Sequence, residues 1–240
     1  MSKNECRMPE SESRGGKSLR HSTFPAPRGD HGHRVQPGSS IWIVRHGERL
    51  DHADPPWLED APEPLNPPLS ATGVQQAKNL GAYLANQGVG HIFASPFRRT
   101  LQTASRVAEV LDLPVKVEYG AGEQLSPDWY PSDPRVWTMD DLQREFPLVD
   151  ASYESVVMPT YPEDWEQCKA RARKTIRRLV ERFGGGLLLV GHGASVSGLA
   201  WGLLDDFPQF KNQCCGPVKI VRNEEGSWDL QLDGDNGVIG

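Results

Sequence analysis

Two short apolar runs, each followed within three residues by a histidine and a glycine, set the strongest limit on how this chain can fold. Residues 41–47 read IWIVRHG and residues 187–193 read LLLVGHG. Four apolar residues in a row without polar alternation are typical of a strand that is buried on both faces. The carboxyl ends of such parallel strands form the crevice where α/β sheets bind ligands. If the two strands are neighbours, the runs predict that His46 and His192 meet at one edge of the sheet.

The rest of the sequence alternates short apolar segments with amphipathic segments, which predicts an α/β fold with a mostly parallel central sheet and helices on both faces. We expect strands at 41–44, 91–95, 115–119 and 187–190, followed by a hairpin formed by VKIVRN and SWDLQLD. We expect helices at 70–87, 98–111, 139–146, 163–183 and 195–204. In the helix at 163–183, Trp165 is expected on the apolar face and the basic residues on a solvated face. The stretch 120–160 has little periodicity and is expected to be an irregular insertion on the substrate side.

The first forty residues have a different composition, rich in Ser, Gly, Pro, Arg and His and nearly free of aliphatic side chains. We expect a disordered tail over residues 1–40 and a single domain over residues 41–240. His31 and His33 are interpreted as part of a solvated segment rather than as metal ligands. The acidic residues of the tail argue against an organelle-targeting helix.

Charge and cysteine content narrow the classes of partner and compartment. The chain has 240 residues and a formal net charge of −6, so the sequence favours neither nucleic acid nor an acidic membrane surface as a partner. Its four cysteines fit neither a disulfide framework nor a zinc site, and no apolar run is long enough for a membrane span. We expect a soluble cytoplasmic protein for which the nucleus also stays open. The oligomeric state is left open, and a dimer is compatible with the sequence.

Arginines accompany the histidines at the predicted strand ends. Arg45 directly precedes His46, and the strand IFAS is followed by PFRR, which carries Arg98 and Arg99. Guanidinium groups match the oxygens of a phosphate, and an imidazole can attack its phosphorus. A crevice that collects two histidines, one of them His192, and two or three arginines is therefore predicted to bind a phosphate.

At these residues the chain resembles the histidine phosphatase superfamily, which includes the cofactor-dependent phosphoglycerate mutases, over about residues 41–200. The family's Arg-His-Gly signature falls on residues 45–47, and its S-x-x-x-R-x-x-x-T-A signature falls on SPFRRTLQTA. The second signature selects Arg99 rather than Arg98 as the phosphate-binding arginine. The family's second histidine falls on His192.

The resemblance also implies a catalytic mechanism. His46 would attack phosphorus and form a phosphohistidine, while Arg45, Arg99 and His192 would bind the equatorial oxygens. The general acid would be Glu123, just past the third strand, which would protonate the leaving oxygen and then activate water. No metal or other cofactor is implied.

A second glutamate and an additional arginine leave alternatives open. Glu118 competes with Glu123, although it lies inside the strand pattern. The run RHGERLD places Arg49 where mutases of the superfamily carry a small hydroxyl residue, which argues against mutase activity. It is instead similar to the suppressor-of-T-cell-receptor-signalling proteins and the ecdysteroid-phosphate phosphatases. Arg49 is expected to contact phosphate, as is Gly193, but Arg49 could instead form an ion pair with a nearby acid (Glu48 or Asp51).

Four aromatic residues lie in irregular segments and are expected either to line an apolar pocket for an aryl leaving group or to pack as a lid: Trp57, Trp129, Tyr130 and Trp137. We expect a metal-independent phosphomonoesterase that acts on a phosphorylated small molecule or a phosphoprotein. The alternatives are a phosphotransferase of the phosphoglycerate mutase type and a non-catalytic domain that binds a phosphorylated partner.

Overall fold

The computed structural model of the chain describes residues 35–134 and 137–240. The predicted tail up to residue 34, with His31 and His33, lies outside the described residues. Just before the first strand, the N–H of Gly38 donates to the carbonyl of Arg222 at 2.8 Å, so this part of the chain contacts the domain. The strands are β1 (Ser40–Arg45), β2 (His91–Ala94), β3 (Val115–Val117), β4 (Leu187–Gly191), β5 (Pro217–Arg222) and β6 (Trp228–Asp233).

The α-helices of the described residues correspond to predicted segments, except for the short α1. They are α1 (Leu50–Ala53), α2 (Ala71–Leu84), α3 (Arg98–Leu111), α4 (Met139–Glu145), α5 (Trp165–Phe183) and α6 (Gly193–Ala200), with short 3-10 helices η1 (Pro55–Glu59), η2 (Tyr119–Ala121) and η3 (Asn236–Val238). Several begin at the caps that their sequences provide. The side chain of Ser70 accepts from the N–H of Gly73 at the start of α2, and Asp164 and Gln167 form a capping box at the start of α5. The predicted helix at 195–204 begins earlier, at Gly193, directly after β4.

In the described residues six strands form one sheet in the order β3-β2-β4-β1-β5-β6. β1 and β2 lie on either side of β4 and run parallel to it, and β3 is parallel to β2. β5 is antiparallel to β1, and β6 is antiparallel to β5. The predicted α/β class with a mostly parallel sheet is therefore confirmed. β1 and β4 are direct neighbours, and Arg45 is in register with Gly191.

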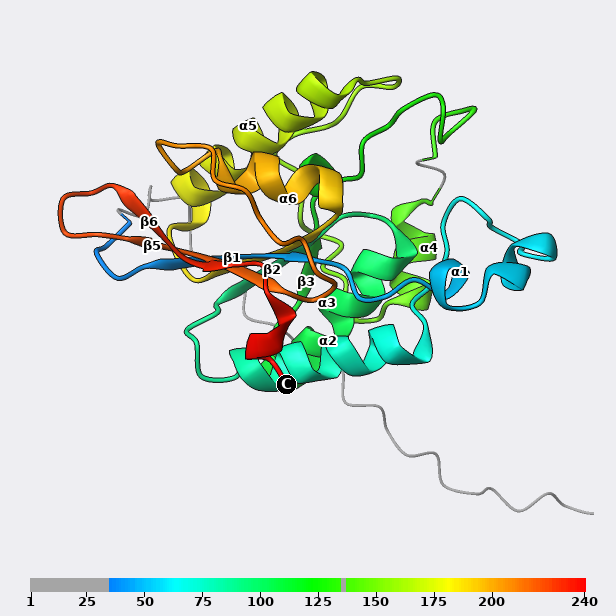
Figure 1. Cartoon of the computed structure of the whole chain (residues 1–240), viewed down its shortest axis with the longest axis horizontal. Coiled ribbons are helices and arrows are strands. Elements are labelled where there is room, and N and C mark those ends of the chain that lie inside the picture. The colour runs from blue at the N-terminus through cyan, green and yellow to red at the C-terminus, as the bar shows by residue number, and fades with distance from the viewer. Residues whose placement is uncertain (1–34, 135–136) are drawn as a thin grey trace, which may run out of the picture. The chain divides into compact units, whose positions relative to one another are not determined.

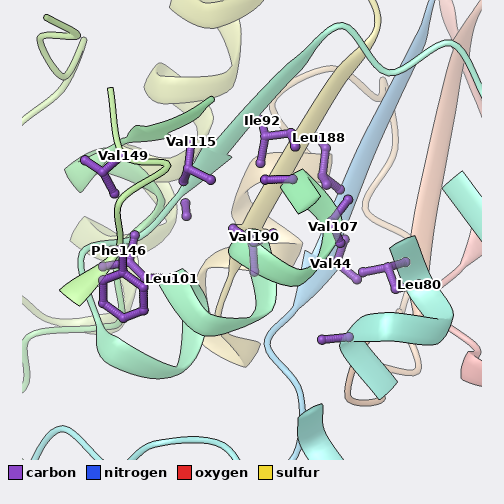
Figure 2. Close-up of a cluster of buried hydrophobic side chains, with 14 of the residues drawn as sticks. Val44, Leu80, Ile92, Leu101, Val107, Val115, Phe146, Val149, Leu188 and Val190 are labelled. Carbon is purple, nitrogen blue, oxygen red and sulfur yellow. The ribbon is translucent and has the colours of Figure 1, made fainter. Parts of the chain in front are cut away.

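The central strands β1, β2 and β4 are buried on both faces, as their unbroken apolar runs predict. Trp42 and Val44 of β1 belong to a core cluster with residues of α2, α3 and α4, whereas Ile41 and Ile43 belong to a second cluster with residues of α5 and α6. Figure 1 shows α5 and α6 on one side of the sheet and α2 and α3 on the other. Figure 2 shows the first cluster, in which the labelled valines and leucines of the strands lie against those of the helices.

The predicted insertion is irregular apart from η2 at its start and α4, but part of it is anchored to the sheet edge. The N–H of Val115 donates to the carbonyl of Leu148 at 2.8 Å, and the N–H of Asp150 donates to the carbonyl of Val115 at 2.9 Å. Within the described ranges, the chain has no helix of the length and apolarity that crossing a membrane requires.

Candidate active site

The carboxyl ends of three neighbouring strands bring the predicted histidines together. The N–H of His46, after β1, donates to the carbonyl of Gly191 at 3.0 Å, and the N–H of Ser95, after β2, donates to the carbonyl of Val190 at 3.0 Å. His192 directly follows Gly191. The rings of His46 and His192 have centroids 5.3 Å apart, and both residues are buried. The sheet therefore places the two histidine rings next to each other at the carboxyl ends of its strands.

His46 is held in a tautomer suited to nucleophilic attack. Its Nδ1 lies 2.7 Å from the carbonyl oxygen of Gly47. Because a carbonyl only accepts, Nδ1 carries the proton of the neutral ring, and Nε2 keeps its lone pair. Burial lowers the pKa of His46 well below its ordinary value of 6.5, and the charges of Arg99 and Arg45 lower it further. The ring is therefore neutral at physiological pH.

His192 is fixed as the complementary tautomer. Its Nδ1 lies 3.1 Å from Nη2 of Arg99, and its Nε2 lies 2.7 Å from the hydroxyl of Ser95. A guanidinium only donates, so Nδ1 accepts and Nε2 donates to Ser95. Burial, followed by the charge of Arg99, lowers the pKa of His192 well below 6.5. This ring is neutral as well.

Two arginines beside the histidines carry buried donors that have no partner among the described residues. Arg99 lies in the first turn of α3 and is 1% exposed, and its Nε and Nη1 have no hydrogen-bond partner among the described residues. Nε of Arg45 is likewise buried without a partner in the described part of the chain, while its Nη1 donates to the carbonyl of Asn212 at 3.1 Å. Buried donors without partners are costly. An oxyanion bound beside the histidines would satisfy them.

The loop after β1 is fixed to α3, so the residues after the strand keep their places. The N–H of Gly47 donates to Oγ1 of Thr103 at 3.1 Å, and that hydroxyl donates to the carbonyl of Arg99 at 2.8 Å. A Cβ at Gly47 would lie 2.6 Å from the carbonyl oxygen of Gly73 in α2. Glycine is required here because the loop and the helix approach so closely.

A pocket of about 520 Å³ opens over these groups. Five of the predicted site residues line it: Arg45, His46, Arg49, Glu123 and Gly193. Gly193 and Ala194 form the first turn of α6, where backbone N–H groups have no intrahelical acceptor. Arg99 and His192 are buried and contact Glu123, with Nη2 of Arg99 and Nδ1 of His192 each 3.4 Å from its Oε2.

The structure separates the two candidate glutamates. Glu123 lines the pocket, and its side chain is 14% exposed. Glu118 is fully buried and accepts hydrogen bonds from the hydroxyls of Tyr153 and Ser155, both at 2.6 Å. Backbone N–H groups also donate to its carboxylate, from Gly120, Val156 and Val157. Glu118 therefore anchors the insertion, and of the two carboxylates Glu123 is the one that faces the pocket.

The arginine alternatives are also distinguished. Arg98 points away from the site, where it pairs with Glu145 at 2.7 Å and lies over the ring of Trp137. Arg49 forms the ion pair that the sequence left open, and its contact with phosphate stays a prediction. It lines the pocket, and its Nε and Nη2 donate to both oxygens of Asp51 at 2.9 and 2.5 Å.

The aromatic residues divide into two groups. Trp129 and Tyr130 line the pocket, whereas Trp57 and Trp137 do not. Trp137 instead stacks on Phe146 with ring centroids 6.3 Å apart. The expectation that Trp165 belongs to the apolar face of its helix is wrong. It begins α5 at the pocket mouth, lines the pocket and is 43% exposed, because the packed stripe of α5 starts one turn later.

The expected solvated basic face of α5 needs a second correction, at Arg171. This residue is 7% exposed and pairs with the buried Glu163. It lies on the same stripe as Cys168, three residues before it, and Thr175, four residues after it. Helical spacing could therefore have identified it as buried. Ser95, the partner of His192, could have been found in a similar way, since it is the last residue of a predicted strand and directly follows β2.

Among residues 35–134 and 137–240, no three or more His, Cys, Asp or Glu side chains are grouped in an arrangement that could hold a metal ion. The polar groups of the pocket are mainly cationic or neutral, which suits an anion. A family model described as histidine phosphatase superfamily (branch 1) matches residues 41–235. The chain belongs to the histidine phosphatase superfamily.

Relatives of this superfamily member include phosphatases and a transcription factor subunit. The chain is 34% identical over 184 residues to the transcription factor tau 55 kDa subunit of Saccharomyces cerevisiae, covering 69% of this chain and 41% of that protein. It is 28% identical over 254 residues to the ecdysteroid-phosphate phosphatase of Drosophila melanogaster, covering 82% of this chain and 33% of that protein. The chain thus spans less than half the length of these relatives.

Solved structures of the superfamily share the fold. The ecdysone phosphate phosphatase from Bombix mori, in complex with tungstate, superimposes with a TM-score of 0.66 at 23% identity. The match covers 80% of this chain and 92% of that one. It agrees with the sheet and helix arrangement described above.

Proposed function

We propose that this chain is a phosphomonoesterase that works through a phosphohistidine on His46. The observation that carries the proposal is the tautomer of His46, whose Nδ1 is bonded to the carbonyl of Gly47, so that Nε2 is free at the pocket. Beside it lie the unpaired N–H groups of Arg99 and Arg45. A neutral nucleophile and preorganised donors are what attack on a phosphate ester requires.

In the first step, Nε2 of His46 forms a bond to phosphorus as the bond to the leaving oxygen breaks. Arg45 and Arg99 stabilise the charge on the equatorial oxygens, and His192 orients Arg99 by accepting from its Nη2. The proton on the Glu123 carboxyl passes to the leaving oxygen, so the product departs as an alcohol. The hydrogen bond from Nδ1 to Gly47 stabilises the positive charge that the ring gains on phosphorylation.

In the second step, water replaces His46 on phosphorus. Glu123, now ionised, accepts a proton from the water as its oxygen attacks, and the bond between phosphorus and Nε2 breaks. Inorganic phosphate and the neutral ring of His46 are regenerated. Oε2 of Glu123 lies 3.4 Å from Nη2 of Arg99, so the carboxyl is close to the phosphoryl group that Arg99 would bind.

The pocket mouth favours an aryl or other hydrophobic phosphate ester. Leu65, Trp129 and Trp165 line it and are 44%, 53% and 43% exposed. Apolar side chains around a cationic floor suit a substrate with an anionic head and a flat apolar body. The phosphatase relatives, which include one named for an ecdysteroid phosphate, support the same class.

The test is hydrolysis of p-nitrophenyl phosphate between about pH 5 and about pH 8 with a chelator present, using wild type and His46→Ala. We expect turnover in the wild type and a loss of at least about 10⁴-fold in the variant. A radiolabelled phosphohistidine, stable to base and labile to acid, should be trapped in the wild type alone. Activity retained in His46→Ala would show that another group is the nucleophile.

Two alternatives are tested by adding a phosphoglycerate acceptor to that assay and by measuring the binding of inorganic phosphate. Transfer of phosphate to a phosphoglycerate acceptor, with a long-lived phosphohistidine, would support a mutase. Absence of turnover together with saturable binding of phosphate would support a non-catalytic domain that binds a phosphorylated partner. The transcription factor subunit among the relatives keeps that second alternative in the test.

A further inference from the structure

The segment that carries Glu123 obtains few of its backbone contacts from the sheet. β3 ends at Val117, and residues 119–121 form only a short 3-10 helix before the chain becomes irregular. Buried carbonyl groups of such a segment need donors from elsewhere. Each carbonyl from 120 to 123 accepts from a side chain: Gly120, Gly122 and Glu123 from Arg171, and Ala121 from Ser195.

Arg171 is the centre of this arrangement. Its Nη1 donates to the carbonyl of Gly120 at 2.8 Å, and its Nη2 donates to the carbonyl of Glu123 at 3.0 Å. The guanidinium thus binds the main chain of the very residue whose side chain faces the pocket. A planar fork with five donors can do this, whereas an ammonium cannot bind the same set of oxygens.

Glu163 fixes Arg171 from the other side. Its Oε2 accepts from Nε of Arg171 at 3.0 Å, and its Oε1 accepts from Nη2. Oε1 also accepts from the N–H of Leu125 at 3.3 Å, and the N–H of Glu163 donates to the carbonyl of Leu125 at 3.1 Å. Glu163 is 3% exposed and Arg171 is 7% exposed, so both charges are withdrawn from water. The pair joins the start of α5 to both ends of the segment 120–125.

We propose that Arg171, oriented by Glu163, is a positioning residue that sets the reach of the Glu123 carboxyl to the leaving oxygen. This inference rests on the proposed function. It separates proton transfer from phosphoryl binding, because Arg171 contacts the backbone around Glu123, while His46 and Arg99 are placed by strand ends and α3. Loss of the Arg171 guanidinium should therefore slow proton transfer from Glu123 to the leaving oxygen and leave phosphate binding nearly unchanged.

The experiment measures kcat/KM for three esters with increasingly poor leaving groups: p-nitrophenyl, phenyl and 2-phenylethyl phosphate. We expect Arg171→Lys to lower kcat/KM by about 30-fold for 2-phenylethyl phosphate and by about threefold or less for p-nitrophenyl phosphate, because a good leaving group needs the acid least. The inhibition constant of inorganic phosphate should change by less than about threefold. Glu163→Gln should steepen the dependence on the leaving group in the same direction.

Two further variants make the result specific. Arg177→Lys is the matched control, because Arg177 lies on the same helix and donates to the carbonyl of Gly202 at 2.8 Å, away from the pocket. It should leave the dependence on the leaving group as in the wild type. Glu123→Gln should steepen that dependence most, and adding Arg171→Lys to it should not steepen it further.

The outcomes separate this inference from the function on which it rests. Equal losses for all three esters in Arg171→Lys, or weaker binding of inorganic phosphate, would show a merely structural role. Loss of folded structure in both the Arg171 and the Glu163 variants, measured by circular dichroism, would also show a merely structural role. Full activity in His46→Ala would instead overturn the proposed mechanism, whatever the Arg171 variants do.

Discussion

The phosphoryl-binding half and the proton-transfer half of the active site are built in different ways. His46 and His192 follow adjacent parallel strands, so backbone hydrogen bonds of the sheet fix the positions of both residues. Glu123 lies in an irregular segment whose carbonyls are bound by side chains of α5 and α6. The first arrangement depends on the sheet and its buried residues. The second depends on a few long polar side chains, so single substitutions should disturb it more selectively.

Among substitutions that leave the nucleophile His46 in place, the largest effect should come from the phosphoryl-binding half, at Arg99. Arg99→Lys keeps the charge but loses the fork, so we expect kcat/KM to fall by about 10³-fold. Arg98→Lys is the matched control, because Arg98 is next to Arg99 in the sequence but its side chain pairs with Glu145 at the surface. That variant should stay within about twofold of the wild type. Similar losses in both variants would mean that the signature had selected the wrong arginine.

The next effect concerns stability and contrasts the two glutamates. Glu118→Gln replaces an oxygen that accepts several buried hydrogen bonds by a donor, so we expect a loss of about 3 kcal/mol in the free energy of unfolding. Glu123→Gln, at the pocket, should cost less than about 1 kcal/mol while it removes proton transfer. Urea unfolding of both variants checks this. If Glu123→Gln were the less stable protein, the assignment of Glu118 as the anchor and Glu123 as the acid would be wrong.

The same contrast explains what could be predicted from the sequence. Unbroken apolar runs identify buried parallel strands, and residues at their ends must share an edge, so His46 and His192 were predicted to meet from local pattern alone. Arg99 was selected over Arg98 by its spacing from Thr103 in the family signature. The two histidines do meet, because sheet geometry converts short sequence patterns into position, whereas phosphate binding by Arg99 stays a prediction.

The proton-transfer half was less predictable because its contacts join residues that are distant in the sequence. Glu123 was preferred to Glu118 only through the family resemblance and the strand pattern. No local pattern shows that Arg171 binds the carbonyl of Glu123, 48 positions away. Helical spacing predicts that Arg171 is buried. Its partners are backbone carbonyls of a loop, however, and the side chains of that loop do not indicate which residue binds them.

A smaller effect is the pH dependence of stability in the phosphoryl-binding half. The pKa values of His46 and His192 are well below 6.5 in the folded protein, mainly because both rings are buried. Below about pH 6.5 the unfolded chain binds more protons than the folded one, so the free energy of unfolding decreases as the pH falls. Each histidine contributes up to about 1.4 kcal/mol per pH unit to this slope.

Substitution tests that slope directly. His46→Asn and His192→Asn should each make the pH dependence of the unfolding free energy shallower between about pH 5 and about pH 6.5. His52→Gln removes an exposed histidine outside the pocket and controls for the loss of one histidine side chain. Urea unfolding across this range measures all four proteins. An unchanged slope in both active-site variants would contradict neutral burial of the rings.

The smallest effect should lie at the pocket mouth, where neither half of the chemistry is touched. Trp165 is exposed beside the cationic floor, so Trp165→Ala should raise KM for 1-naphthyl phosphate by about five-fold through lost apolar contact. KM for a small alkyl phosphate should not change, because its body does not reach the mouth. Trp57→Ala, outside the pocket, is the control. If Trp165→Ala raised both KM values equally, Trp165 would act by positioning α5. Because α5 carries Arg171, which binds the segment of Glu123, the pocket mouth and the proton-transfer half would then be one unit.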